Sequence, residues 1–143
     1  MAQDPACASV ADANVLLSAV TGGRARLVLA RADLADVVTT VAALDEVNEY
    51  AEPLARRLRL PLGTVLLAVA TLPVTVVDRD EYAASLREAG RRIGRRDPDD
   101  IDTLALALHL DAPVWSNDRD FEGAGVEWYT TARLLKTLEL GHG

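Results

Sequence analysis

Acidic side chains are concentrated in one short part of this chain. Seven aspartates lie between residues 95 and 121: Asp97, Asp99, Asp100, Asp102, Asp111, Asp118 and Asp120. Carboxylates placed close together repel one another, so protons, solvent or cations must compensate their charge. No group of His and Cys residues accompanies them, and sites built from oxygen ligands suit hard cations such as Mg²⁺ or Mn²⁺. The sequence therefore indicates a divalent-metal site.

Metal ions held by carboxylates are suited to phosphoryl chemistry. Magnesium keeps several waters and is commonly held by a few carboxylates together with a substrate phosphate. Two such ions, roughly 3.5–4 Å apart, stabilise the attacking and leaving oxygens of an in-line displacement, and a bound water becomes the nucleophile. Hydrolysis of a phosphodiester by this route needs neither a histidine nor a protein nucleophile.

Four acids from distant parts of the chain could form such a site. Asp12 follows the apolar residues SVA and Asp118 follows PVWSN, so each is expected just beyond the end of a strand. Asp100 lies in the first turn of the helix that leads to PVW, and Glu46 lies in the helix after DVVTT. Ligands of open α/β sheets bind at the carboxyl ends of the strands. We therefore expect these acids to converge at that edge.

Apolar strands and helices alternate along the chain, which predicts an α/β fold with a mostly parallel sheet of about four to five strands. Residues 1–143 are expected to form a single domain. The expected strands are 8–12, 35–40, 74–77, 112–116 and 125–130. The expected helices are 14–20, 23–31, 40–58, 62–72, 80–94, 97–110 and 131–138, with Thr39 or Thr40 as an N-cap and Pro53 as a kink or restart.

The uncharged stretch 60–77 approaches the length of a membrane span. Pro61, Gly63 and Pro73 interrupt it, so we expect a short buried helix, a break at Pro73 and then a buried strand at 74–77. We therefore predict no association with a membrane. The apolar residues of 62–72, with those of the first two helices, exceed what one small domain obviously needs, which favours a homodimer or a groove for a partner segment.

Composition limits the remaining classes of function. The formal net charge of −7 is not that of a protein that attracts nucleic acid by bulk charge, although an acidic metal site accounts for part of it. The single Cys7 excludes an internal disulfide framework, and the first ten residues lack the features of a signal peptide, so we expect a cytoplasmic location.

Arginines are the expected local attraction for phosphate. Arg92, Arg95 and Arg96 immediately precede the acidic segment and could bind phosphate bidentately, with Arg24 as a weaker candidate. A solvated helix end, where cations are favoured, is an equally good interpretation of the first three.

Four motifs, in order and almost end to end, resemble the PIN-domain ribonucleases, the fold of the toxin in many bacterial toxin–antitoxin pairs. They are Asp-Ala-Asn at 12–14, TVAALDEV at 40–47, DPDDIDTLALAL at 97–108 and SNDRDF at 116–121. The resemblance runs from VADANVLLSAV to VEWYTTARLL and implies a three-layer α/β/α domain.

The resemblance also implies roles for individual residues. Asp12, Glu46, Asp100 and Asp118 would be the catalytic acids, and Asp12, Asp100, Asp118 and Asp120 would be the metal ligands. Asn14, Asp97 and Ser116 would support these ligands, with Ser116 standing where the family usually has Thr. It further implies Mg²⁺ or Mn²⁺ as cofactor, single-stranded RNA as substrate, cleavage by water that leaves a 5′-phosphate and a 3′-hydroxyl, and an antitoxin protein as partner.

Several alternatives stay open. Each aspartate could simply cap a helix or a turn. Asp97 and Asp99 compete with Asp100, and Asp45 competes with Glu46 because adjacent helical residues point about 100° apart. Two other functions are a PIN nuclease of RNA processing that is not a toxin, and a catalytically silent interaction module of the same fold.

Overall fold

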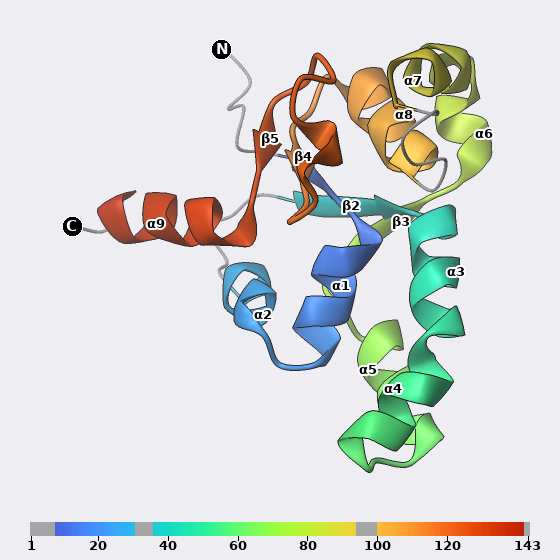
Figure 1. The fold of residues 1–143 in the computed structure, drawn as a ribbon, viewed down its shortest axis with the longest axis vertical. Helices are drawn as coiled ribbons and strands as arrows, with labels where there is room; N and C mark the ends of the chain where they lie inside the picture. The colour runs from blue at the N-terminus through green and yellow to red at the C-terminus, as the bar shows by residue number, and fades with distance from the viewer. Residues whose placement is uncertain (1–7, 31–35, 94–99, 142–143) are drawn as a thin grey trace.

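The structure is a computed structural model that describes residues 8–30, 36–93 and 100–141. Its five-stranded sheet is parallel throughout and has the order β3-β2-β1-β4-β5 (Figure 1). The strands are β1 (Ala8–Ala11), β2 (Asp36–Thr40), β3 (Thr75–Val77), β4 (Val114–Trp115) and β5 (Trp128–Tyr129). The predicted α/β class and parallel sheet are confirmed.

Helices cover both faces of the sheet, as the predicted three layers require (Figure 1). They are α1 (Ala13–Val20), α2 (Arg24–Leu29), α3 (Val41–Glu49), α4 (Ala51–Leu58), α5 (Leu62–Ala70), α6 (Arg79–Tyr82), α7 (Leu86–Ile93), α8 (Ile101–Leu110) and α9 (Thr131–Gly141), with 3₁₀ turns η2 (Ala83–Ser85) and η4 (Arg119–Phe121). On one face α7 and α8 bury Ile93, Leu104 and Leu106, and on the other α1 buries Val15 and Leu16.

The strand order reverses between β1 and β4. The chain proceeds from β1 outward through β2 to β3, and then returns to place β4 on the other side of β1, followed by β5. Alternation along these two strands sends Val10 and Val114 into one core, and Ala11 and Trp115 into the other. The chain therefore continues from β1 into α1 in one core and from β4 to Phe121 of η4 in the other. Open α/β folds bind their ligands at such a reversal, at the carboxyl ends of the strands.

The long predicted helix 40–58 is two helices. Thr40 is the N-cap of α3, and its hydroxyl accepts a hydrogen bond of 2.9 Å from the amide of Ala43. The chain turns at Tyr50, and Pro53 lies in the first turn of α4, where its missing N–H costs no helical hydrogen bond. The sequence therefore located the restart correctly.

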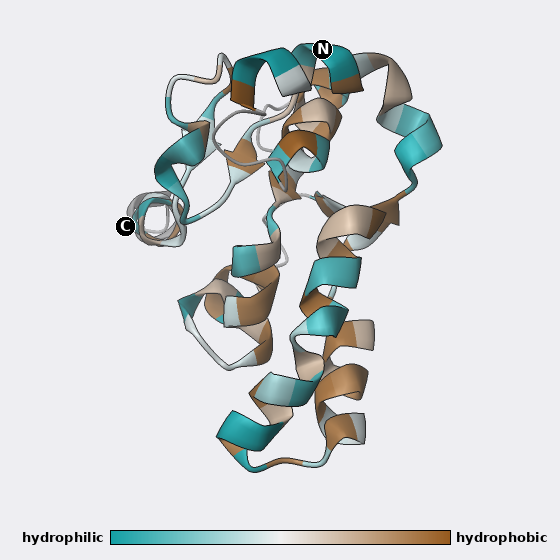
Figure 2. Cartoon of the chain, turned by 45° about the vertical axis from the view of Figure 1, so that its right-hand side comes forward, coloured by the Kyte–Doolittle hydropathy of each residue, from teal (hydrophilic) through white to brown (hydrophobic). Residues whose placement is uncertain are grey.

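Two predicted buried segments are more exposed than expected. β3 is an edge strand with Thr75 and Val76 exposed, because only β2 pairs with it. On α5 only Val65 and Val69, one helical turn apart, are buried against neighbouring helices. The remaining apolar face is exposed, and Leu67 is 64% exposed. Figure 2 shows that most of the α5 ribbon is hydrophobic. Among the described residues no helix is both long and apolar enough to cross a bilayer.

Asp102, in the first turn of α8, belongs to a contact between helices. The buried Tyr82 hydroxyl donates to Asp102 Oδ2 over 2.5 Å, and Arg79 Nε lies 3.3 Å from the same oxygen. Burial raises the pKa of Tyr82, and the hydrogen bond to Asp102 raises it further. This aspartate thus fixes the position of α6 against α8.

Tyr82→Phe is expected to lower the free energy of unfolding at neutral pH by about 1–2 kcal/mol, because Asp102 loses a hydrogen bond. The folded state keeps the Tyr82 proton to a higher pH than the unfolded chain. This contribution is fully present below about pH 10 and is lost as the pH rises towards the folded-state pKa. Urea unfolding at about pH 7 and about pH 10.5 measures both effects. Between these two pH values, Tyr82→Phe should lose less stability than the wild type. The control Tyr50→Phe, at an exposed position, should lose as much stability as the wild type.

Candidate functional site

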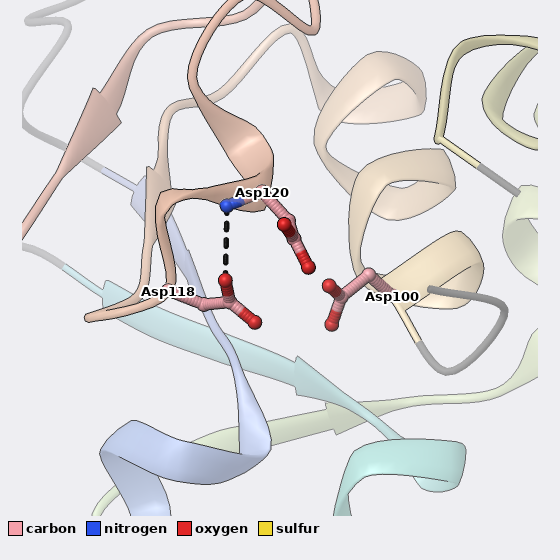
Figure 3. A group of neighbouring side chains, drawn as sticks. All are labelled: Asp100, Asp118 and Asp120. Carbon is pink, nitrogen blue, oxygen red and sulfur yellow. Dashed lines mark hydrogen bonds between the residues drawn. The ribbon is translucent and has the colours of Figure 1, made fainter. Parts of the chain in front are cut away.

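Three aspartates meet at the carboxyl edge of the sheet. Asp100, Asp118 and Asp120, here called the aspartate cluster, each offer a carboxylate oxygen, and these oxygens all lie within 4.8 Å of one another. Figure 3 shows their side chains pointing toward a common space. Asp100 is buried at the N-cap of α8, and Asp118 and Asp120 are half-buried at η4, beyond β4.

Local hydrogen bonds explain why Asp118 and Asp120 face the same side. Asp118 is the N-cap of η4, and its Oδ1 accepts a hydrogen bond of 2.9 Å from the amide of Asp120. The amide of Asp118 in turn donates to Ser116 Oγ over 3.0 Å. The SNDRDF turn is therefore held by its own side chains, with both carboxylates directed toward α8 (Figure 3).

Asp12 lies beside the cluster. It is the N-cap of α1 and only 5% exposed, and its Oδ1 accepts from the amide of Ala13 over 2.7 Å. Its Oδ2 accepts from Ser116 Oγ over 2.8 Å and from Asn14 Nδ2 over 3.0 Å. Ser116 thus joins the Asp12 carboxylate to the amide of Asp118 through one hydroxyl. Among the described residues, Asp12 does not belong to the group within 4.8 Å.

Asn14 ties the end of β1 to the end of β4. Its Nδ2 also donates to Ser116 Oγ over 3.1 Å, and its Oδ1 accepts from the amide of Asn117 over 3.2 Å. The predicted contact with Asp12 is therefore present. Asn117 was not singled out from the sequence, although its Oδ1 accepts from the amide of Thr131 at the start of α9. Its position directly after the predicted strand 112–116 is the sequence feature that could have identified Asn117 as part of the site.

Comparison with known proteins identifies the family. The model of the PIN domain matches residues 10–139. The chain belongs to the PIN-domain family. The predicted resemblance is confirmed, and all four motifs lie within the matched residues.

Three solved structures have a fold similar to that of this chain. VapBC2 from Rickettsia felis, bound to a DNA fragment from their promoter, aligns with a TM-score of 0.68 and 11% identity, over 86% of this chain and 98% of that one. VapBC-1 from nontypeable Haemophilus influenzae aligns with a TM-score of 0.62 and 12% identity, over 87% of this chain and 98% of that one. FitAcB from Neisseria gonorrhoeae aligns with a TM-score of 0.58 and 18% identity, over 86% of this chain and 97% of that one. No curated protein matches the sequence.

Among the described residues of this PIN domain, Glu46 does not belong to the group of carboxylates that lie within 4.8 Å of one another. It is half-buried on α3, whereas its competitor Asp45 is exposed, which favours Glu46 as the acid that faces the protein. Asp97, a predicted supporting residue, lies outside the described residues.

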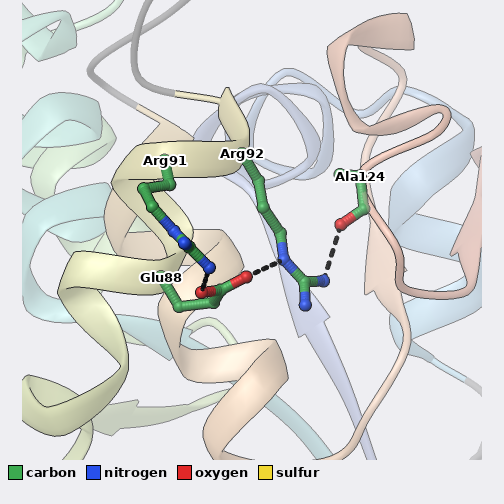
Figure 4. A network of polar contacts seen from close by, with 4 residues as sticks. All are labelled: Glu88, Arg91, Arg92 and Ala124. Carbon is green, nitrogen blue, oxygen red and sulfur yellow. Dashed lines mark hydrogen bonds and ion pairs between the residues drawn. The ribbon is translucent and has the colours of Figure 1, made fainter.

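The predicted phosphate contacts differ in position. Arg95 and Arg96 lie outside the described residues. Arg24 is exposed at the start of α2. Asp12 caps one end of α1 and Arg24 follows the other end, so the length of this eight-residue helix, roughly 12 Å, separates the two positions along the chain. Arg92 is engaged within the protein: its Nε donates to Glu88 Oε2 over 2.7 Å and its Nη1 to the carbonyl of Ala124 over 2.9 Å (Figure 4).

The cluster has the chemistry of a hard-cation site. Its donors are carboxylate oxygens from two separate segments, with a third segment, at Asp12, hydrogen-bonded alongside. Oxygen ligands without nitrogen or sulfur suit Mg²⁺ or Mn²⁺. Three carboxylates so close together also repel one another, which a divalent cation offsets. The residues present therefore fit such an ion.

This repulsion predicts that Asp120→Asn stabilises the metal-free protein. Asp120 is suited to the test because its amide, not its carboxylate, makes the hydrogen bond to Asp118. We expect a gain of roughly 0.5–1 kcal/mol in the free energy of unfolding, measured with EDTA at low ionic strength and diminished by added salt. Asp36→Asn, at an exposed position at the other end of a strand, should give no such gain. Equal effects of the two substitutions would show that the cluster is not strained by charge.

Proposed function

We propose that this PIN domain is a metal-dependent endoribonuclease that hydrolyses phosphodiester bonds of single-stranded RNA. The observation that carries the proposal is the convergence of the Asp100, Asp118 and Asp120 carboxylates within 4.8 Å at the strand-order reversal of a PIN-domain chain. A sheet edge of this kind is where α/β proteins bind their ligands.

In this proposal Asp100, Asp118, Asp120 and Asp12 hold Mg²⁺ or Mn²⁺. When bound, the metal supplies an activated water and stabilises charge on the phosphate oxygens. Ser116 and Asn14 orient Asp12, since both donate to its Oδ2. Glu46 completes the catalytic acids from α3. The products would carry a 5′-phosphate and a 3′-hydroxyl.

RNA would be attracted locally and not by the whole surface, because the net charge is −7. Arg95 and Arg96, which immediately precede the acids in the sequence, are the proposed phosphate contacts, with Arg24 as a weaker candidate; Arg92 was also predicted to be one, but its described contacts are within the protein. Preference for RNA is proposed from the family resemblance.

We further propose that the protein is a cytoplasmic toxin inhibited by an antitoxin protein, and that it forms a homodimer. The resemblance to toxin-like PIN domains and the likeness of fold to the VapBC and FitAcB structures support the proposal of a toxin with an antitoxin partner. The exposed apolar side chains of α5, which include Leu62, Leu66 and Leu67, support the proposal of a homodimer.

The decisive experiment is cleavage of single-stranded RNA by the purified protein with Mn²⁺ or Mg²⁺. We expect EDTA to abolish cleavage, and Asp100→Asn and Asp12→Asn each to reduce the rate by about 100-fold or more, because metal coordination contributes several kcal/mol. Asp36→Asn is the control for loss of a carboxylate away from the site. Cleavage that persists at the wild-type rate in both variants would contradict the proposal. Metal binding without cleavage would instead favour a silent interaction module.

A matched pair tests the fourth acid. Glu46→Gln is expected to reduce the rate of RNA cleavage by about tenfold or more, whereas Asp45→Asn should leave it close to the wild-type value, because Glu46 is the more buried of the two. The same cleavage assay measures both. The reverse order of effects would assign the role to Asp45.

A further inference from the structure

Arg92 connects two segments that are distant in the sequence but adjacent to the aspartate cluster. From α7 its guanidinium donates to the Ala124 carbonyl, which lies in the loop after η4 (Figure 4). Glu88, one turn earlier on α7, holds the same guanidinium through Nε. We name these three residues the Arg92 bridge. Arg91 also contacts Glu88 but, in the described contacts, does not reach the loop.

The loop is shaped to receive this side chain. Gly125 has a φ of +87°, and a Cβ placed there would overlap Arg92 Nη1, closer than van der Waals contact allows, so the guanidinium would have to shift. Gly123 has a similar φ of +79°, yet within the described part of the chain no atom beyond its neighbours lies within 4 Å of its Cβ position. The two glycines share a left-handed backbone, so only Gly125 has the additional requirement of space for Arg92.

One joined segment carries two of the three acids, and the other, α7, packs against α8, whose N-cap is Asp100. Ala124 follows Asp118 and Asp120 by a few residues, while α7 precedes the segment that leads to Asp100. Phe121 and Ala124 are both buried against the core that contains α7 and α8 residues. The distance between Asp100 and the other two acids therefore depends on how the η4 loop is held against α7 and α8, and the bridge is a polar contact between them.

We propose that Arg92 is a positioning residue for metal binding: through Ala124 it holds Asp118 and Asp120 at the correct distance from Asp100. The inference rests on the proposed function and deepens it. It differs from the expectation that Arg92 binds RNA phosphate, because both contacts described for its guanidinium are within the protein.

The sign of the effect separates positioning from simple charge. Loss of a cation near an acidic site should, by charge alone, strengthen binding of Mn²⁺. Loss of a positioning contact should weaken it. Arg92→Met and Arg91→Met remove the same charge from neighbouring residues that share Glu88, but only the first removes the contact with Ala124.

The experiment measures Mn²⁺ affinity by titration calorimetry, well below the melting temperature of each variant. We expect Arg92→Met to weaken binding about tenfold, at the lower end of what residues that orient metal ligands contribute, and Arg91→Met to leave it unchanged or slightly stronger. Arg92→Met with wild-type affinity would overturn the proposal. A loss of RNA affinity alone, with Mn²⁺ affinity retained, would assign Arg92 to phosphate instead.

A second pair keeps the test valid if Arg92→Met does not fold. Gly125→Ala must displace the guanidinium, whereas Gly123→Ala introduces similar backbone strain in open space. Neither changes the charge. We expect only Gly125→Ala to weaken Mn²⁺ binding, and equal effects would overturn the proposal.

Amide hydrogen exchange in the metal-free protein gives a readout that does not depend on the proposed function. The Asp120 amide donates to Asp118 Oδ1, so its exchange rate reports order within the cluster. Arg92→Met and Gly125→Ala should speed its exchange more than Arg91→Met and Gly123→Ala do. Absence of Mn²⁺ binding by the wild type would refute the metal-dependent function. Unchanged Asp120 exchange in the two bridge variants would refute the positioning role.

Discussion

The Ser116 hydroxyl is the contact on which the geometry of the candidate site depends. It donates to Asp12 Oδ2 and accepts from the amide of Asp118 and from Asn14 Nδ2, so one oxygen links the ends of the two central strands. A hydroxyl has one donor and two acceptor sites, and all are occupied here. A methyl group at this position could replace none of these bonds. The position therefore requires a hydroxyl oxygen, which Ser116 supplies.

The strand-order reversal makes this contact possible. β1 and β4 are parallel neighbours, with Val10 opposite Val114 and Ala11 opposite Trp115, so Asp12 and Ser116 leave the sheet side by side. Beyond the sheet, β1 continues into α1 and β4 continues into η4. We expect the carboxylates gathered at this edge to destabilise the metal-free fold through repulsion, which hydrogen bonds from Asn14, Ser116 and the Asp120 amide partly offset. In the proposed function, the metal-free fold gives up part of its stability for affinity toward a cation, as functional sites commonly do.

Much of this arrangement could be predicted from the sequence, because strand ends in a parallel sheet share one edge. Asp12 and Asp118 were placed correctly beyond β1 and β4 for that reason. The exposure of β3 and of one face of α5 could not be predicted, since hydropathy reports what a segment could bury and not whether a neighbour covers it. The Arg92 bridge was also missed. Its acceptor is a backbone carbonyl, which every residue has and no side-chain pattern marks.

The aspartates before α8 show where residue type and spacing stop being informative. Asp100 and Asp102 both lie at the N-terminus of α8, where the macrodipole favours any acid, so residue type alone does not distinguish a metal ligand from a helix cap. Geometry does: residues two apart on a helix point about 200° apart. Asp102 accordingly faces α6 and accepts from Tyr82, while Asp100 joins Asp118 and Asp120. An acid that has both a phenol and an arginine as partners has its charge compensated within the fold. In the cluster three carboxylates lie close together, and in the proposed function a bound divalent cation compensates their charge.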